Sequence, residues 1–363
     1  MATLQNAPPS SLHEASYMHS LRQSLVSIAV AGAAMTAIFV ISQCFETPPV
    51  APRFFQLTKL FGIVLAVNIS GWLISACMKT DKLYDMVGTG SFVIATMYTL
   101  LQSHVCCDWS STIWWRQFVI STLCLVWAVR LGSYLMTRVS HRGESHRFGD
   151  VKYHPIDFLS FWFGQVMWIT LVGLPVYLVN LQSNAMVTSR MAHGSSSSSI
   201  MTSMSWIDGF TIGLALFIAG FCLGAQADHE KEVYKRSRQS SDSSRSSLSQ
   251  PSSSLPPSND SCVDIPWIDT GLWSESRHPN HLGEMMVWLG IAMFAIDSLP
   301  PSFPLTLACL SSPIFVTLQL TCLGDLPSLD SQAKTRWADH PHYQSYVART
   351  GSLLPLAIEK MIH

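Results

Sequence analysis

The densest group of residues that could do chemistry lies in the stretch TGLWSESRHPNHLGE, residues 270–284, directly before the apolar run MMVWLGIAMFAI. Only 12% of the chain is charged, so an Arg, two His and two Glu at the start of an apolar run need an explanation. The Arg277 guanidinium can bind an anion, and the free N–H groups at the start of a helix favour the same kind of ligand. The stretch therefore predicts an anion-binding site, for which a nucleotide phosphate is the commonest ligand.

Pro279 predicts where a helix begins, because proline is favoured in the first helical turn. A helix that starts there puts Asn280, Gly283 and Glu284 within one turn, on neighbouring faces. If the apolar run spans a membrane, Glu284 lies about one turn inside it, where a carboxylate is costly without a partner. A salt bridge at the helix end is the alternative explanation for Arg277, Asn280 and Glu284.

A second polar stripe precedes this stretch, at helical spacing. Its members are Gly220, Gly224, Asp228 and Lys231. The two glycines predict a close contact with another helix, and the acid and base then meet the membrane interface. A structural ion pair between Asp228 and Lys231 is the alternative.

Long apolar blocks must position these residues. The chain has 363 residues, of which 48% are hydrophobic, and the blocks lack the alternation of a membrane barrel, so we predict an all-α, polytopic transmembrane bundle. A span needs about 17 to 25 mostly apolar residues. Eight blocks qualify, with seven spans as the alternative: Ser24 to Cys44, Leu57 to Cys77, Met86 to Ser103, Ile113 to Leu135, Phe158 to Asn180, Trp206 to Gln226, Leu282 to Asp297 and Phe303 to Leu323.

The Lys and Arg residues that flank eight spans fall mostly on one side of the membrane, and cytoplasmic flanks are enriched in such residues. This bias predicts that both termini are cytosolic. It also predicts a positive pocket at one leaflet, although charges that only set the topology are the alternative for some of its members. Those members are Arg130, Arg138, Arg147, Lys231 and Arg277.

Composition argues against several other classes of protein. A net charge of −1 offers no basic surplus for nucleic acid, and the nine Cys show no zinc-ligand spacing, so we expect free thiols and no metal site. The first twenty residues show no signal peptide. We expect a polar tail (1–23), a bundle (24–355) interrupted by a disordered Ser/Pro-rich tract (240–261), and a second tail (356–363).

Several strings resemble a known family. GLWSESRHPNHLGE resembles the GLW…RHPNYxGE signature of membrane proteins with a steroid 5-alpha reductase C-terminal-like domain, specifically their domain-of-unknown-function 1295 branch. WAVRLGSYLMTR, GFCLGAQADHEK and YQSYVARTGSLLP resemble further family segments in the same order, and the likeness runs from Asp81 to Pro355. The chain departs from the family pattern at Gly224, Glu230, His281, Asp330 and Ser145–His146.

The resemblance implies a membrane-embedded reductase that uses NADPH to reduce a C=C bond in a lipophilic, steroid-like or other lipid substrate. Asp228, Arg277, Asn280, Glu284 and Tyr346 match motifs that hold NADPH in steroid 5-alpha reductases. With their neighbours and the positive pocket, the candidate cofactor-binding residues are Arg130, Arg138, Arg147, Asp228, Lys231, Arg277, His278, Asn280, Glu284, Tyr343 and Tyr346.

The reaction also needs an acid near the substrate carbonyl, for which Tyr84, Asp85 and Tyr98 are the catalytic candidates; an interfacial Tyr that anchors the chain in the membrane is the alternative. We expect the lipid bilayer and a lipophilic small molecule as partners, with no obligatory protein partner, and an endoplasmic reticulum location. Two rival functions remain open. One is an S-adenosylmethionine-dependent methyltransferase of the isoprenylcysteine or lipid type, and the other is a catalytically inactive scaffold or lipid-binding protein.

Overall fold

The computed structural model describes residues 51–104, 112–142, 148–149, 151–182, 208–247, 267–323, 325–354 and 356. Within these residues there are nine α-helices and no strand, which confirms the all-α prediction. The first predicted span, Ser24 to Cys44, lies outside the described residues.

The helices follow one another with short turns between several of them. They are α2 (Ala51–Met78), α3 (Lys82–His104), α4 (Thr112–Arg142), α5 (Pro155–Asn180), α7 (Gly209–Ser247), α8 (Pro279–Ser298), α9 (Phe303–Leu318), α10 (Asp325–Trp337) and α11 (Pro341–Arg349), with 3₁₀ turns at Val151–Tyr153 and Gly271–Ser274 and a π-helical turn at Gln319–Leu323.

Five helical stretches are long and apolar enough to cross a membrane. They are Gln56–Met78, Ile113–Val139, Pro155–Asn180, Gly209–Ser240 and Phe303–Cys322, and each overlaps a predicted span. Helices α3 and α8 occupy the positions of two further predicted spans. The chain is therefore a helical, multi-pass membrane protein by length and composition, whereas the count of eight spans stays a prediction.

The chain divides into two compact units. The first unit comprises residues 1–214 and 291–315, and the second comprises residues 215–290 and 316–363. Helices α7, α8 and α9 each contribute residues to both units. The units are described separately below.

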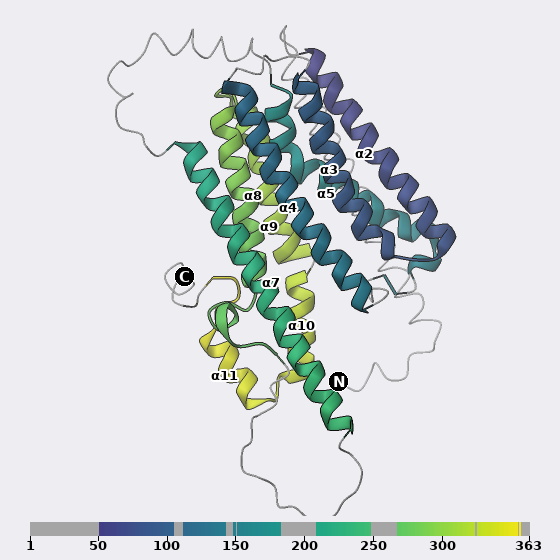
Figure 1. Cartoon of the computed structure of the whole chain (residues 1–363), viewed down its shortest axis with the longest axis vertical. Coiled ribbons are helices and arrows are strands. Elements are labelled where there is room, and N and C mark those ends of the chain that lie inside the picture. Colours follow the sequence, from purple (N-terminus) through teal and green to yellow (C-terminus); the bar gives the residue numbers. More distant parts are fainter. Residues whose placement is uncertain are drawn as a thin grey trace, which may run out of the picture. The chain divides into compact units, whose positions relative to one another are not determined.

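Helix α5 forms the centre of the first unit and packs against α2, α3 and α4, as Figure 1 shows. Its most apolar stretch is 72% buried, against 28% for the corresponding stretches of α2 and α4. Pro155 stands in its first turn, where a missing N–H costs no helical bond. A helix that is apolar on all sides belongs inside a bundle, which is where α5 lies.

Buried polar side chains join the helices of the first unit. Gln165 Nε2 on α5 donates to Asn68 Oδ1 on α2 at 2.8 Å, and Asn68 Nδ2 donates to Ser91 Oγ on α3 at 3.1 Å. Farther along α5, Asn180 Nδ2 donates to Thr99 Oγ1 on α3 at 3.0 Å. Because polar groups inside an apolar bundle are costly without partners, these hydrogen bonds fix the register between helices.

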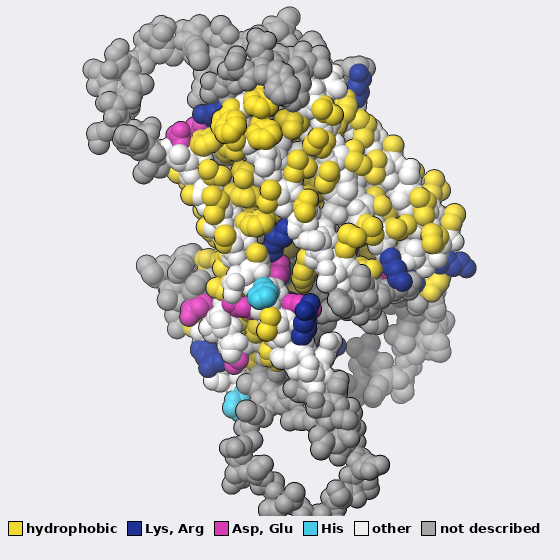
Figure 2. Space-filling view, viewed as in Figure 1, with side chains coloured by type: hydrophobic (Ala, Val, Ile, Leu, Met, Phe, Trp, Pro, Cys, Tyr) yellow, Lys and Arg dark blue, Asp and Glu magenta, His cyan; other side chains and the backbone are white. Residues whose placement is uncertain are grey.

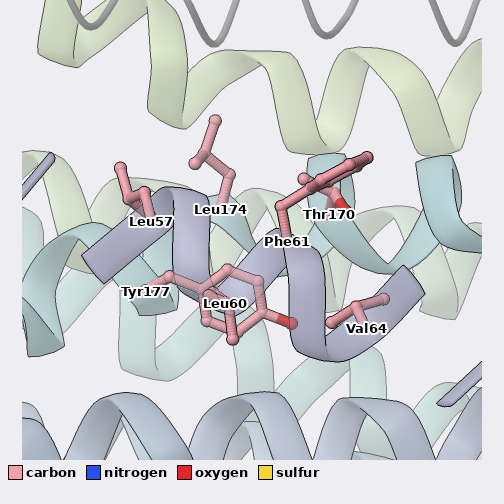
Figure 3. A pocket seen from close by; sticks show the side chains of 7 residues that line it. All are labelled: Leu57, Leu60, Phe61, Val64, Thr170, Leu174 and Tyr177. Atoms are coloured by element: carbon pink, nitrogen blue, oxygen red, sulfur yellow. The ribbon is translucent and has the colours of Figure 1, made fainter. Parts of the chain in front are cut away.

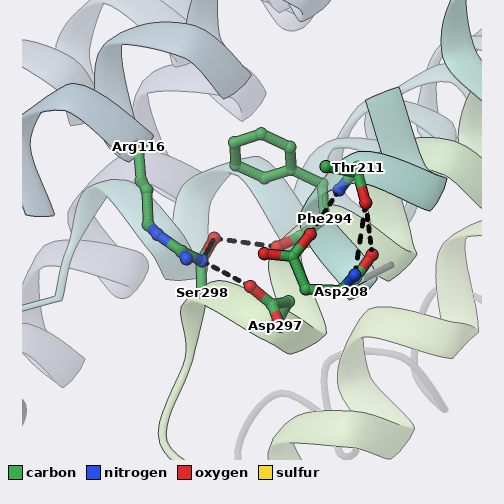
Figure 4. A network of polar contacts seen from close by, with 6 residues as sticks. All are labelled: Arg116, Asp208, Thr211, Phe294, Asp297 and Ser298. Carbon is green, nitrogen blue, oxygen red and sulfur yellow. Dashed lines mark hydrogen bonds and ion pairs between the residues drawn. The ribbon is translucent and has the colours of Figure 1, made fainter. Parts of the chain in front are cut away.

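An ion pair joins α4 to the end of α8 within the first unit (Figure 4). Arg116 Nη1 lies 2.6 Å from Asp297 Oδ2 and 3.2 Å from Ser298 Oγ. Nearby, Thr211 N donates to Asp208 Oδ1 at 2.8 Å, and this bond is the main cause that lowers the pKa of the Asp208 carboxyl. The Arg116 contacts join the start of α4 to the end of α8, and the Asp208 bond caps the start of α7.

Large hydrophobic side chains cover the outer faces of α2, α3 and α4. Leu73 is 50% exposed, Trp115 55% and Val129 66%. Figure 2 shows this apolar surface on the side of the first unit that faces the viewer. Exposed apolar area of this extent is typical of a surface that contacts lipid.

Helix α7 overlaps the first residues of the predicted Ser/Pro-rich tract (240–261), whose disorder stays a prediction. Helix α7 continues to Ser247, and residues 248–261 lie outside the described residues. The charged part of α7 consists largely of residues that favour a helix. Arg236 Nε also pairs with Glu232 Oε1, four residues earlier, at 3.2 Å, and such a pair stabilises a helix.

Candidate functional site

The turn ahead of α8 is fastened to α7 in the second unit. Gly271 has φ of +61°, and a Cβ at this position would lie 2.6 Å from Glu230 Oε2. That carboxylate oxygen accepts the N–H of Leu272 at 2.9 Å. Trp273 Nε1 donates to the Ala227 carbonyl at 3.1 Å. Glycine is therefore needed at 271, both for its backbone angle and for the approach of Glu230.

The C-terminal segment holds the same turn from another direction. Arg277 N donates to the Gly351 carbonyl at 2.9 Å, and Ser276 and Gly351 form an isolated parallel bridge. Tyr346 on α11 donates its hydroxyl hydrogen to the Trp273 carbonyl at 2.8 Å. The backbone that carries Arg277 is thus fixed by hydrogen bonds before any ligand contributes.

Arg277 and His278 share one carboxylate oxygen. Asp330 Oδ1 on α10 lies 3.7 Å from Arg277 Nη1 and 3.2 Å from His278 Nε2. Burial lowers the pKa of His278 and outweighs the opposing effect of Asp330. His278 is therefore neutral at pH 7, and its contact with Asp330 is a hydrogen bond rather than an ion pair.

Buried polar atoms of Arg277 and Asn280 lie at the start of α8. Arg277 Nε and Asn280 Oδ1 are buried, and neither has a hydrogen-bond partner among the residues that the structure describes. The Arg277 side chain is 17% exposed. Buried polar groups are nearly always paired in native proteins, so these two atoms, three positions apart in the chain, are exceptions to the usual pattern.

Helices α7 and α8 approach each other closely beside this site. A Cβ at Gly220 would lie 2.6 Å from the Gly283 carbonyl oxygen, and a Cβ at Gly283 would lie 2.7 Å from Gly224 N. The glycine stripe predicted such a contact. Only residues without a side chain allow the two backbones this distance, which brings Asp228 and Lys231 of α7 toward the start of α8.

Three of the predicted cofactor-binding residues lie near this contact between α7 and α8: Lys231, Glu284 and Asp228. Lys231 Nζ lies 4.9 Å from the centre of the Trp273 ring. Glu284 Oε1 accepts a hydrogen bond from Trp288 Nε1 at 3.0 Å, so this carboxylate has the partner that its depth in the helix requires. Asp228 is partly buried on α7.

Tyr343 and Tyr346 lie in an aromatic cluster with Trp267, and Trp337 packs against it. Burial raises the pKa of both Tyr hydroxyls, and for each the Arg277 charge acts in the opposite direction. Both phenols are therefore neutral hydrogen-bond donors, and the Arg277 side chain is near enough to influence them.

The candidate acids of the first unit are engaged in hydrogen bonds. Tyr84 donates its hydroxyl hydrogen to the Phe161 carbonyl at 3.0 Å. Tyr98 donates to Gln56 Oε1 at 2.9 Å. Both hydroxyls thus join helices in the form that the structure describes.

The structure pairs two residues that the sequence assigned to different roles. Arg138 Nη2 on α4, a predicted cofactor-binding group, lies 3.0 Å from Asp85 Oδ2 on α3, a predicted acid. Arg130 also lies on α4 in the first unit, whereas Arg147 lies outside the described residues. Of the five residues of the predicted positive pocket, Lys231 and Arg277 lie in the second unit.

Sequence reasoning missed Glu230, Gly271 and Asp330 as members of the site. Glu230 and Asp330 drew attention only as departures from a family pattern. Their roles depend on contacts between residues about 40 and 50 positions apart, such as Glu230 with Leu272 and Asp330 with His278, which spacing along one helix does not reveal.

Within the described residues, no group of three His, Cys, Asp or Glu could hold a metal ion.

The long apolar helices and the apolar outer surface define a helical integral membrane protein, with a polar site at the start of α8. The chain belongs to the family described as protein of unknown function (DUF1295), which matches residues 71–350. No curated protein matches the chain, and no solved structure matches it either.

Proposed function

We propose that the protein is a membrane-embedded reductase that binds NADPH at the start of α8 and reduces a C=C bond in a lipophilic substrate. The observation that carries this proposal is the pair of buried, unpaired atoms, Arg277 Nε and Asn280 Oδ1, on a backbone that is already fixed. A site that is ordered in advance binds its ligand with a smaller entropic cost.

The residues of the second unit fit the parts of a dinucleotide phosphate. Arg277 and Lys231 supply positive charge, and the first N–H groups of α8 favour an anion. Asn280 offers an amide to a sugar or nicotinamide group. His278, neutral at pH 7, and the neutral Tyr343 and Tyr346 add hydrogen-bonding groups without extra charge.

NADPH would supply a hydride for the β-carbon of an enone, and the protein must stabilise the oxygen that becomes an enolate. Tyr84, Asp85 and Tyr98 remain the proposed sources of that stabilisation. Each would have to exchange a contact within the first unit for the substrate oxygen. Tyr84 would give up its bond to Phe161, Tyr98 its bond to Gln56, and Asp85 its pair with Arg138. A lipophilic substrate could enter from the bilayer, in keeping with the apolar outer surface.

We also propose that the chain spans the membrane eight times, with both termini in the cytosol. Eight spans with both termini in the cytosol place the start of α8 on the cytosolic side, where NADPH is found. The motifs shared with steroid 5-alpha reductases support a relationship to those enzymes. A membrane enzyme of lipid metabolism with a cytosolic cofactor site fits the endoplasmic reticulum.

Thermal unfolding of the purified protein with NADPH, NADH or S-adenosylmethionine tests the proposal, because a ligand bound only by the folded state raises its Tm. We expect NADPH to raise the Tm more than NADH does, and S-adenosylmethionine to leave it unchanged. Arg277→Ala should remove the NADPH effect, whereas Arg236→Ala, which removes an exposed charge from α7, should keep it. A Tm shift with S-adenosylmethionine alone would favour a methyltransferase, and no shift with any ligand would favour a scaffold.

A further inference from the structure

The cavity between α2 and α5 in the first unit is too small for an organic ligand (Figure 3). Its volume is about 20 Å³, which is room for about one water molecule. Its lining is almost entirely apolar, and the two hydroxyl groups in it, those of Thr170 and Tyr177, already donate to carbonyls of α5. The polar contacts around Asp330 in the second unit offer more for ligand recognition.

Asp330 lies near the middle of α10 and reaches two consecutive residues of the site. Its Oδ1 lies 3.7 Å from Arg277 Nη1 and 3.2 Å from His278 Nε2. The π-helical turn Gln319–Leu323 precedes α10, and such turns are frequent at functional sites. One carboxylate on α10 thus acts on both a cation and a hydrogen-bonding ring.

Asp330 balances the charge of Arg277 without using up its N–H groups. The Arg277 side chain is 17% exposed, and a largely buried guanidinium is costly without an opposite charge. At 3.7 Å, the contact between Nη1 and Oδ1 is an ion pair that is longer than a hydrogen bond. Arg277 Nε also has no hydrogen-bond partner among the described residues. The guanidinium therefore keeps donors for a phosphate oxygen.

Asp330 also determines which nitrogen of His278 carries the hydrogen. His278 is 7% exposed and neutral at pH 7, so one ring nitrogen has a hydrogen and the other has none. A carboxylate oxygen accepts hydrogen bonds and cannot donate them. The hydrogen therefore lies on Nε2, which faces Asp330, and Nδ1 is left as an acceptor.

The ring of His281 restricts how the His278 ring can turn. The two rings lie within 3° of parallel, and their centroids are 5.4 Å apart. With Asp330 at Nε2 and His281 beside the ring, the direction of His278 Nδ1 is set by the folded chain.

We propose that Asp330 is a positioning residue that gives Arg277 and His278 different parts of one ligand. Arg277 donates to a phosphate oxygen, whereas His278 Nδ1 accepts a hydrogen bond from a sugar hydroxyl or an amide N–H group. This assignment rests on the proposed binding of NADPH, which carries all three groups. An ionised phosphate oxygen only accepts hydrogen bonds, so it cannot use Nδ1.

The role of His278 links binding to pH. Burial lowers the pKa of His278, Asp330 of α10 raises it, and the charges of Arg277 and of Lys231 on α7 lower it. Protonation in acid puts a hydrogen on Nδ1, so the acceptor is lost. Binding should therefore weaken as the pH falls through the pKa of His278. Without the Asp330 carboxylate this pKa is lower, and the weakening moves to more acidic pH.

Calorimetric titration of the full chain with NADP⁺ between about pH 7.5 and 5.5 tests the role of Asp330. NADP⁺ is the probe because the oxidised cofactor is stable in acid. The variants are Asp330→Ala, Asp330→Asn and Asp330→Glu. The matched control is Asp269→Asn, which removes a carboxylate that pairs with Arg349 in the same unit. Thermal unfolding checks that each protein is folded.

We expect Asp330→Ala to weaken NADP⁺ binding at pH 7.5 by at least about tenfold, the size of one charge-assisted hydrogen bond. Asp330→Glu should retain most of the wild-type affinity, because it keeps the carboxylate. Asp330→Asn keeps an oxygen that accepts from Nε2, so it should bind more tightly than Asp330→Ala, and its weakening in acid should occur at lower pH than in the wild type. Asp269→Asn should bind like the wild type.

Wild-type affinity in Asp330→Ala would overturn the role of Asp330 and leave the reductase proposal standing. Tighter binding of the wild type in acid would do the same, and so would equal pH dependence in the wild type and Asp330→Asn, because titration of the ligand's own phosphate would then explain it. Absence of NADP⁺ binding by the wild type would instead overturn the reductase proposal, and the role of Asp330 with it.

Discussion

The two units of the protein use polar side chains differently. In the first unit, polar groups such as Asn68, Gln165 and Asn180 lie between helices and bond to side chains of neighbouring helices. In the second unit, polar groups such as Glu230 and Tyr346 bond to the backbone of one irregular segment.

The two arrangements of polar side chains suit different tasks. Bonds between side chains on neighbouring helices set the register of a bundle, and they leave their own groups satisfied. Bonds to the backbone of a loop leave that loop's side chains available for a ligand. The first unit is therefore expected to control stability, and the second to control binding of an anionic ligand.

The largest effect is expected from the interior of the first unit. Trp162 is 1% exposed and packs edge-to-face against Tyr84 and Phe158. Trp162→Ala should lower the free energy of unfolding by about 3–5 kcal/mol, because it creates a large cavity. Thermal unfolding in detergent measures this loss. Trp115→Ala, on the exposed side of α4, is the matched control and should cost far less.

A smaller effect is expected where the backbones of α7 and α8 approach in the second unit. Gly220→Ala places a methyl group 2.6 Å from the Gly283 carbonyl oxygen and should cost about 1–3 kcal/mol through strain. It should also weaken nucleotide binding, because it pushes α8 away from Lys231. Gly62→Ala in α2 is the control, since nothing lies within 4 Å of its Cβ. Equal Tm values for the two variants would contradict the close contact.

The smallest effect concerns pH. Burial holds the pKa of His278 below its usual value of 6.5, so in acid the unfolded chain takes up a proton that the folded chain does not. The resulting stability is present above about pH 6.5 and is lost as the pH falls through the pKa of the folded state. His278→Gln should therefore make Tm less dependent on pH between 7.5 and 5.5 than in the wild type. The same replacement at the exposed His342 is the matched control.

Local features of the site could be predicted from sequence. Pro279 marked the first residue of α8, and the glycines of α7 predicted the contact that Gly220 makes with Gly283. These features depend on the geometry of single helices. The apolar blocks predicted the membrane-spanning helices for the same reason.

Other features depend on residues far apart in the chain, and sequence could not give them. The bond from Leu272 to Glu230 requires the positive φ of Gly271, which no helical periodicity indicates. The ion pair of Asp85 with Arg138 joins two helices whose relative rotation the sequence leaves open. The end of α7 at Ser247, inside the Ser-rich tract, is not evident from composition, which favours disorder there.

A direct binding titration is the sharpest test of whether the start of α8 binds NADPH through Arg277 and Asn280. The fluorescence of reduced nicotinamide is followed as wild type, Arg277→Ala, Asn280→Ala and the control Arg236→Ala are added. We expect saturable binding to the wild type and to Arg236→Ala, and loss of binding in Arg277→Ala and Asn280→Ala. All four proteins should remain folded. Binding of NADPH to Arg277→Ala and Asn280→Ala with wild-type affinity would contradict it.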